Sequence, residues 1–254
     1  MNRTVPLLQN EPLAQTETRV EGLNDWYRQH AARAVLEQVL TRPASGQIAL
    51  VSSFGVESVV LLHLVSVIRR DTPVLFLDTE MLFAETLAYQ TELAKFLKLS
   101  DVRVIKASEA LLSRQDLDKT LHQSNPDACC DLRKTKPLAD ALRGFDGWIT
   151  GRKRFHGGRR TEIDFFEAEP GTGRIKINPL AYWTRDDIQT YIEENRLPRH
   201  PLVATGYTSV GCMPCTSPTG KHEDPRAGRW RKFEKTECGI HFENGRAIQT
   251  GALA

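Results

Sequence analysis

The sequence has little net charge and no long apolar run. Its 34 lysines and arginines nearly balance its 32 aspartates and glutamates, which leaves a formal net charge of +2 over 254 residues. This balance argues against bulk nucleic-acid binding, although it leaves room for a local anion site. No apolar run approaches the ~20 residues of a membrane span, and the N-terminus lacks the apolar core of a signal peptide. We therefore expect a cytoplasmic protein that binds neither nucleic acid nor a membrane.

A small-residue turn stands where a glycine-rich phosphate loop would be expected. The apolar run 47–51 predicts a buried strand, the turn 52–55 (Ser-Ser-Phe-Gly) follows it, and 56–68 has the pattern of a helix. A strand, a small-residue turn and a helix in this order aim backbone N–H groups at an anion. The turn is neither a Walker A motif nor G-x-G-x-x-G, so an ordinary turn between strand and helix stays open.

Strand and helix patterns alternate further along the chain. The segments 73–77 and 102–105 are predicted strands, and 82–97 between them is a predicted helix. This alternation implies an α/β fold with a parallel sheet that binds ligands at the carboxyl ends of its strands. Ser53 and Asp78 are expected at such ends.

Four further segments complete the predicted organisation. Residues 1–20 are polar and without a pattern, so we expect a loose N-terminal arm. The segment 23–40 predicts one helix. A second helix is predicted over 129–142, although Pro137 would break or kink it. After Cys215 the chain is basic, irregular and rich in glycine and proline, which favours a mobile tail.

The cysteines arrive as two pairs and a single residue. The pairs are Cys129-Cys130 and Cys212-x-x-Cys215, and Cys238 stands alone near the C-terminus. Structural zinc usually takes two spaced pairs, whereas neighbouring residues project about 100° apart on a helix. A [4Fe–4S] cluster tolerates an adjacent pair, because each thiolate can bind a different iron. We therefore favour the cluster over zinc. Disulfides are disfavoured by the missing secretory signal, and buried free cysteines stay as the alternative.

The loop 151–160 is rich in glycine and carries five basic residues after a predicted strand end at 147–150. Such a loop suggests a polyanionic small molecule as its ligand. A solvated basic loop or an RNA contact would have the same composition.

Taken together, these motifs resemble the sulfonucleotide reductases, which reduce adenylyl sulfate or phosphoadenylyl sulfate in sulfate assimilation. The resemblance runs from about Gln47 to His241. Its most specific parts are Cys129-Cys130-x-x-Arg133-Lys134, Gly206-Tyr207-x-Ser209-x-Gly211-Cys212-x-Pro214-Cys215-Thr216, Arg226-Ala227-Gly228-Arg229-Trp230 and Glu237-Cys238-Gly239-Ile240-His241. Ser52-Ser53-Phe54-Gly55 and Leu77-Asp78-Thr79 match more weakly. The sequence departs from the family at His156-Gly157, where a Gln-Ser pair is usual.

The resemblance implies a fold and a set of site residues. The fold is the doubly wound, mainly parallel sheet of the adenine nucleotide α-hydrolase-like type, over residues 21–220, with an irregular tail over 221–254 that carries the catalytic cysteine. The two cysteine pairs resemble the subfamily that carries [4Fe–4S] on Cys129, Cys130, Cys212 and Cys215 and acts on adenylyl sulfate. The implied substrate-binding residues are Ser52, Ser53, Leu77, Lys134, Gly151, Arg160, Arg226 and Arg229. Cys238 is the implied nucleophile, with His241 near it.

The number of cysteines suggests how the implied reaction ends. Cys238 accepts the sulfuryl group as S-sulfocysteine and expels AMP, and another thiol must then attack Cys238 to release sulfite. If the other four cysteines hold iron, the chain has no resolving thiol, so an outside dithiol protein is required. The family uses thioredoxin or a similar protein.

Three other functions stay in view, and the oligomeric state is left open. One is reduction of phosphoadenylyl sulfate. Another is an ATP-dependent PP-loop enzyme such as a tRNA thiolation enzyme, although the turn 52–58 lacks the S-G-G-x-D-S pattern suited to pyrophosphate. The third is a nucleic-acid-binding regulator with a metal centre, which the near-zero charge disfavours.

Overall fold

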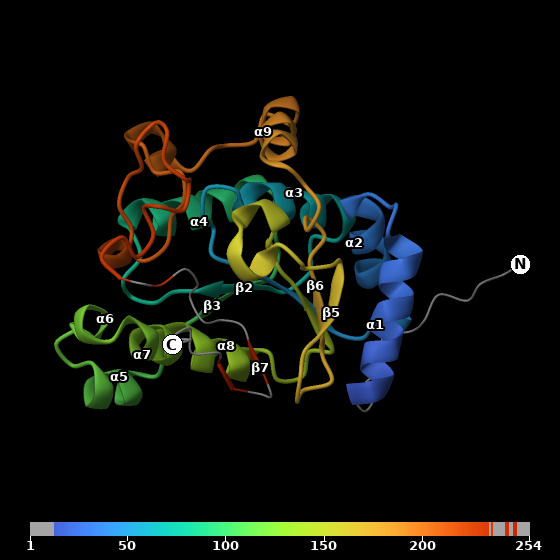
Figure 1. The fold of residues 1–254 in the computed structure, drawn as a ribbon, viewed down its shortest axis with the longest axis horizontal. Coiled ribbons are helices and arrows are strands. Elements are labelled where there is room, and N and C mark those ends of the chain that lie inside the picture. The colour runs from blue at the N-terminus through green and yellow to red at the C-terminus, as the bar shows by residue number, and fades with distance from the viewer. Residues whose placement is uncertain (1–12, 234, 236–241, 244–245, 248–254) are drawn as a thin grey trace, which may run out of the picture.

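The computed structural model of the chain describes residues 13–233, 235, 242–243 and 246–247. Its centre is a six-stranded sheet in the order β3-β2-β1-β4-β6-β5 (Figure 1). The strands are β1 (Ile48–Ser52), β2 (Val74–Leu77), β3 (Val102–Ile105), β4 (Gly147–Ile149), β5 (Phe166–Ala168) and β6 (Ile175–Ile177). All neighbouring pairs run parallel except β5 and β6, which are antiparallel at one edge. The predicted parallel α/β fold is therefore confirmed.

Helices cover both faces of the sheet (Figure 1). Their bounds are α1 (Leu13–Tyr27), α2 (Ala32–Thr41), α3 (Ser58–Ile68), α4 (Ala84–Phe96), α5 (Glu109–Gln115), α6 (Leu121–Ser124), α7 (Pro126–Cys130), α8 (Lys136–Ala141) and α9 (Arg185–Glu194). Short 3₁₀ turns occupy Pro43–Ser45, Arg154–His156, Gly158–Arg160, Pro201–Thr205 and Met213–Cys215. A separate small hairpin pairs β7 (Phe242–Glu243) with β8 (Arg246–Ala247).

Alternation along the strands divides the core between the two faces. Leu50 of β1 and Phe76 of β2 belong to the large apolar cluster shared with α2, α3 and α9. Their neighbours Ala49 and Leu75 belong to a smaller cluster with Leu138 of α8. Successive strand residues point to opposite faces, so a sheet with helices on both sides needs continuously apolar strands. The apolar runs of the sequence meet this requirement.

The N-terminal helices differ from the prediction. Residues 13–20, expected to be part of a loose arm, form the first half of α1, where Thr16 and Val20 are buried. The single helix predicted over 23–40 is two helices, because α1 packs on β5 while α2 packs on α3. Asn24 of α1 accepts from the backbone N–H of Phe166 and donates to its carbonyl, both at 2.9 Å. These bonds satisfy backbone groups of an edge strand that would otherwise be open to pairing.

The predicted helix through the tandem cysteines exists, but its middle is a π-turn. The turn spans Asp131–Thr135 between α7 and α8. Pro137 comes two residues after the turn, and its ring would clash with the carbonyl four residues earlier, that of Arg133, in a regular α-helix. The wider π-turn accommodates the proline, so the helix continues instead of breaking.

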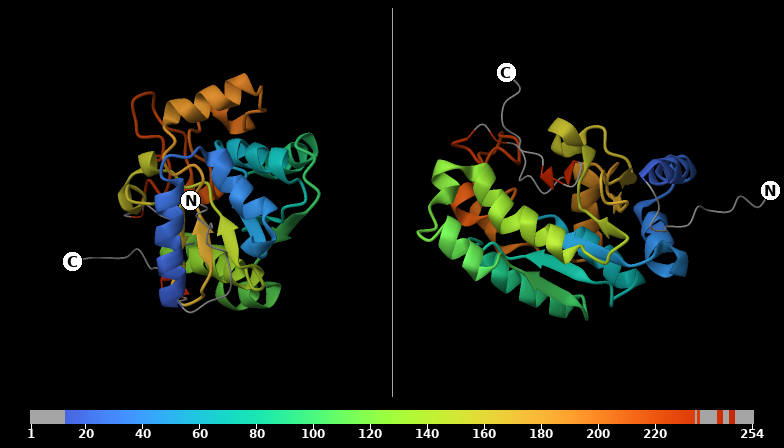
Figure 2. Two further views of the ribbon diagram at one scale, coloured as in Figure 1. Left: turned by 90° about the vertical axis from the view of Figure 1, so that its right-hand side faces the viewer. Right: turned by 90° about the horizontal axis from the view of Figure 1, so that it is seen from below.

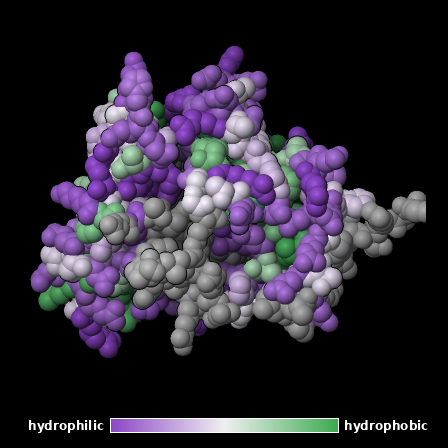
Figure 3. All heavy atoms as spheres, viewed as in Figure 1, coloured by the Kyte–Doolittle hydropathy of each residue, from purple (hydrophilic) through white to green (hydrophobic). Residues whose placement is uncertain are grey.

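The C-terminal part of the described chain lies far from α1. The orange-to-red segment 200–233 is at one end of the molecule and α1 is at the other, as Figure 2 shows from two further sides. Within the described residues, no helix is both long and apolar enough to cross a membrane. The face seen in Figure 3 is mainly hydrophilic, with scattered apolar patches.

Candidate active site

A pocket of about 240 Å³ opens at the carboxyl ends of β1, β2 and β4. The chain runs outward from β1 to β2 and β3, then returns to place β4 on the other side of β1. Ligands of open α/β sheets bind where the strand order reverses in this way. The pocket is lined by all eight residues predicted to bind the substrate, namely Ser52, Ser53, Leu77, Lys134, Gly151, Arg160, Arg226 and Arg229.

The turn after β1 forms one wall of the pocket. Phe54 adopts a positive φ of 47°, and its backbone N–H donates to the Ser52 hydroxyl at 3.2 Å. Its buried ring packs edge-on against Phe76 at 5.3 Å. α3 begins at Ser58 without a side-chain cap, and Ser58 and Leu61 of its first turn line the pocket. The positive end of the helix dipole therefore faces the pocket, as an anion site requires.

Glu57 lies in the same wall, and the sequence reasoning missed it. Its carboxylate accepts from Lys153 Nζ at 2.8 Å and contacts His156 Nε2 at 3.1 Å. Burial would raise the pKa of Glu57, but Lys153 and His156 outweigh this and lower it to about 2. Burial lowers the pKa of Lys153 and of His156. The sequence did offer a signal for Glu57, because this glutamate stands in the turn between a predicted strand and a predicted helix, where the site was expected.

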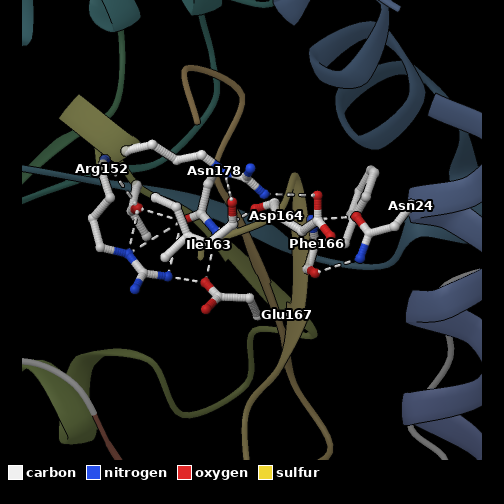
Figure 4. A network of polar contacts seen from close by, with 9 residues as sticks. Asn24, Arg152, Ile163, Asp164, Phe166, Glu167 and Asn178 are labelled. Atoms are coloured by element: carbon white, nitrogen blue, oxygen red, sulfur yellow. Dashed lines mark hydrogen bonds and ion pairs between the residues drawn. The ribbon is translucent and has the colours of Figure 1, made fainter. Parts of the chain in front are cut away.

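Much of the positive charge of the loop 151–160 is neutralised locally. The guanidinium of Arg152 points at Glu167, to which it donates, and at Asn178, 3.0 Å away (Figure 4). Arg154 stacks 4.2 Å from the ring centre of Tyr182. Lys153 is held by Glu57. The loop therefore offers an anionic ligand fewer uncompensated positive charges than its composition suggests.

Arg229 is held by its surroundings at another wall. Its guanidinium stacks 4.6 Å from the ring centre of Trp230, and Nη1 donates to the Val210 carbonyl at 3.1 Å. A Cβ on Gly211 would lie 2.2 Å from Nη2, so only glycine leaves room for this guanidinium. The Nε atom is buried and finds no hydrogen-bond partner among the described residues. A buried donor without a partner is costly, so this atom marks a place for an anionic ligand.

The four paired cysteines lie together beside the pocket. Cys129, Cys130, Cys212 and Cys215 line one small cavity. The second pair is brought there by an antiparallel bridge between Leu82 and Cys212 and by a 2.7 Å hydrogen bond from the Met213 N–H to the Met81 carbonyl. Lys134 and Trp230 line both this cavity and the pocket at the carboxyl ends of the strands. The two sites therefore share a wall.

The thiols of this cluster differ in their electrostatic surroundings. Burial, with the neighbouring Cys130 and Cys212, raises the pKa of Cys129 to about 12. Burial would also raise the pKa of Cys212, but Lys134 and a hydrogen bond with the Thr79 hydroxyl at 3.2 Å lower it. Within the described part of the chain, no three His, Cys, Asp or Glu residues converge on one metal-ion position. Four thiols that line one cavity are the donor set that a [4Fe–4S] group takes, one thiolate for each iron.

A buried ion pair supports the tandem-cysteine helix, and the sequence reasoning did not find it. Arg133 Nη2 lies 2.7 Å from Asp116, and the two side chains are 2% and 1% exposed. Arg133 also donates to the Thr79 carbonyl at 2.9 Å. Removal of either partner would leave an uncompensated buried charge. Arg133 was quoted in the motif Cys-Cys-x-x-Arg-Lys, but nothing local in the sequence pairs it with Asp116.

The two predicted catalytic residues, Cys238 and His241, lie outside the described residues. The nearest described position before them is Lys235, which is buried and forms an ion pair with Asp127 of α7. Its Nζ also lies 5.8 Å from the ring centre of Trp230. Lys235, three residues before Cys238 in the sequence, is therefore held next to the shared wall.

The fold and the pocket define a doubly wound α/β protein with a basic pocket at the switch point of its sheet. Residues 47–218 match the phosphoadenosine phosphosulfate reductase domain family. The chain is 47% identical to adenosine 5′-phosphosulfate reductase of Mesorhizobium japonicum, covering 88% of this chain and 87% of that protein. It is 45% identical to the protein of the same name in Chelativorans, covering 89% and 92%. The chain belongs to the adenosine 5′-phosphosulfate reductase family, as the sequence motifs predicted.

Solved structures agree with this assignment. Phosphoadenylyl-sulfate reductase from Candida auris superposes with a TM-score of 0.67 at 26% identity, covering 79% of this chain and 97% of that one. Candida glabrata FMN adenylyltransferase superposes with a TM-score of 0.53 at 15% identity, covering 84% and 77%, and shows the fold alone. The adenine nucleotide α-hydrolase-like fold is thus confirmed.

Proposed function

We propose that this chain reduces adenylyl sulfate, which is adenosine 5′-phosphosulfate, to sulfite and AMP. The observation that carries the proposal is the shared wall, in which Lys134 and Trp230 line both the basic pocket and the four-cysteine cavity. The names of the relatives that share most of the chain support the same substrate. Such an enzyme is an oxidoreductase of sulfate assimilation and of cysteine biosynthesis.

The proposed mechanism assigns the pocket to the phosphosulfate and the tail to the chemistry. Arg160, Arg226, Arg229 and Lys134 hold the anionic oxygens. The Cys238 thiolate attacks the sulfur atom, a sulfur–sulfur bond forms, and the bond from sulfur to the AMP oxygen breaks. Cationic groups favour this step, because they stabilise both the thiolate and the charge on the departing phosphate. His241 is proposed to lie near the nucleophile.

Release of sulfite needs a second thiol. A thiolate from outside the chain attacks the Cys238 sulfur, sulfite leaves with the electron pair, and a mixed disulfide forms. The second thiol of the same partner then resolves that disulfide and restores the Cys238 thiol. The partner is therefore a dithiol protein, for which we propose thioredoxin or a similar protein. We propose that the reaction, with adenylyl sulfate as substrate and a dithiol protein as reductant, takes place in the cytoplasm.

We propose that Cys129, Cys130, Cys212 and Cys215 hold a [4Fe–4S] cluster. When bound, this group supplies a fixed charge beside the substrate. Lys134 links the two sites, because it lowers the pKa of Cys212 and also lines the substrate pocket. We assign 21–220 to the nucleotide-binding unit and 221–254 to the segment that carries Cys238.

The function is tested by turnover with and without a thiol donor. Given adenylyl sulfate alone, protein purified without air should release about one AMP per chain and then stop, because Cys238 stays sulfated. Reduced thioredoxin should restart turnover and release sulfite. Phosphoadenylyl sulfate should react more slowly, because Arg152 and Lys153 are already paired with carboxylates and are not open to an added phosphate. Equal rates would support the phosphoadenylyl-sulfate alternative, and a requirement for ATP would contradict the proposal.

The cluster is tested by metal analysis. Anaerobically purified protein should contain about four irons and four sulfides per chain. Cys130→Ser and Cys212→Ser should lose this iron, because each removes a thiolate from the shared cavity. Cys238→Ser is the matched control and should keep it. Stoichiometric zinc without iron in the wild-type protein would contradict the assignment.

A further inference from the structure

His156 bridges an acid and a base inside the substrate pocket. Its Nε2 lies 3.1 Å from a carboxylate oxygen of Glu57, and its Nδ1 lies 3.0 Å from Nη1 of Arg160. All three residues line the pocket. Glu57 comes from the turn after β1, whereas His156 and Arg160 come from the loop after β4. The bridge therefore ties together the two loops on either side of the switch point.

The partners fix the protonation state of the bridging ring. A guanidinium offers only donors, so the Nδ1 atom that faces Arg160 must accept. A carboxylate offers only acceptors, so the Nε2 atom that faces Glu57 must donate. Only the neutral ring with its proton on Nε2 meets both demands. Burial, which lowers the pKa of His156, favours the same state.

The backbone between His156 and Arg160 is held by local 3₁₀ hydrogen bonds, from the Gly157 N–H to the Arg154 carbonyl and from the Arg160 N–H to the Gly157 carbonyl. Gly157 and Gly158 lie between the two bridged residues, at φ 71° and 59°. A Cβ built on either glycine would meet no atom within 4 Å. The segment that leads to Arg160 is therefore unpacked at these two positions. Backbone bonds do not set the side-chain torsions of Arg160, so side-chain contacts such as the His156 bridge set the direction of the guanidinium.

We infer that His156 is a positioning residue that holds the Arg160 guanidinium toward the phosphosulfate of the substrate, with Glu57 holding His156 in turn. This role rests on the proposed function, because the phosphosulfate is the anion that Arg160 would meet. His156 acts through Arg160 and takes no part in the chemistry. Its role needs one acceptor and one donor at a fixed separation, and a glutamine side chain offers both on one amide.

Two substitutions separate this role from simple packing. His156→Leu fills the space but removes both polar contacts, whereas His156→Gln keeps a donor for Glu57 and an acceptor for Arg160. Each is combined with Cys238→Ser, which blocks turnover, and the Kd for adenylyl sulfate is measured by calorimetry. His156→Leu should weaken binding about tenfold, the size expected for a hydrogen bond to a charged group. His156→Gln should stay within about threefold of the parent.

A double-mutant cycle with Arg160→Ala completes the test. If His156 acts through Arg160, adding His156→Leu to Arg160→Ala should change the Kd by less than about twofold. Equal weakening by His156→Leu and His156→Gln, or full additivity with Arg160→Ala, would overturn the assignment. So would unchanged binding in His156→Leu. A Cys238→Ser parent that binds no adenylyl sulfate would instead contradict the proposed function itself.

Discussion

The Cys238→Ser protein is expected to release no measurable AMP from adenylyl sulfate. A serine hydroxyl is a weak, hard nucleophile at neutral pH, whereas the thiolate is soft and suits an attack on sulfur. We expect the single-turnover rate of AMP release to fall at least about a thousandfold, as for loss of other nucleophiles. Rapid-quench measurement of AMP, with mass spectrometry of the chain, checks this. The wild-type chain should gain a sulfuryl group on Cys238, and the variant should gain none.

Cys238 lies outside the described residues, but it follows closely on a described one. Cys238 is the third residue after Lys235, and three residues of extended chain span at most about 10 Å. Lys235 is paired with Asp127 and lies against Trp230, which lines the substrate pocket. Truncation before Glu237 should therefore abolish AMP release while iron content and nucleotide binding persist. An adduct on another residue, or AMP release by the truncated chain, would show that the mechanism is wrong.

Arg229→Ala is expected to have the second largest effect. It removes a guanidinium that contacts Trp230 and the Val210 carbonyl and that fits there because Gly211 has no side chain. The loss of such a preorganised donor should remove about 2–4 kcal/mol of transition-state stabilisation, and kcat/KM should fall accordingly. Steady-state kinetics with thioredoxin in excess measures this. Arg226→Ala, at the same pocket, should lower kcat/KM in the same direction.

Arg231→Ala is the matched control for this prediction. Arg231 lies two residues along the chain and pairs with Glu223 on the surface, where the side chains are 44% and 40% exposed. Exposed ion pairs contribute little, so kcat/KM should change by less than about twofold. If Arg229→Ala and Arg226→Ala both keep wild-type kinetics, the phosphosulfate must bind elsewhere.

Local patterns in the sequence were sufficient to predict the strands β1 to β4 and the edge of the sheet where the pocket opens. β3 matches its predicted range, 102–105. Parallel strands place their carboxyl ends at one edge, so Ser53 and Asp78 could be expected at that edge without coordinates. Ser52 and Leu77 were implied by the family resemblance. The helix boundaries were less predictable, because the separation of α1 from α2 depends on the different elements against which they pack.

By itself, the sequence determined the class of fold, the two cysteine pairs and the basic character of the site, because these follow from residue type and spacing. Only the tertiary structure decided which charges remain for a ligand. Arg152, Lys153 and Arg160 are close in sequence, yet Glu167 neutralises the first, Glu57 the second, and His156 bridges the third. Glu57 and Glu167 come from another loop and from β5, and no local pattern encodes a pairing across such separations. His156 lies in the same loop as Arg160, but only the folded loop brings the two side chains together. The same reason hid the Asp116–Arg133 pair and the wall that joins the cysteines to the pocket.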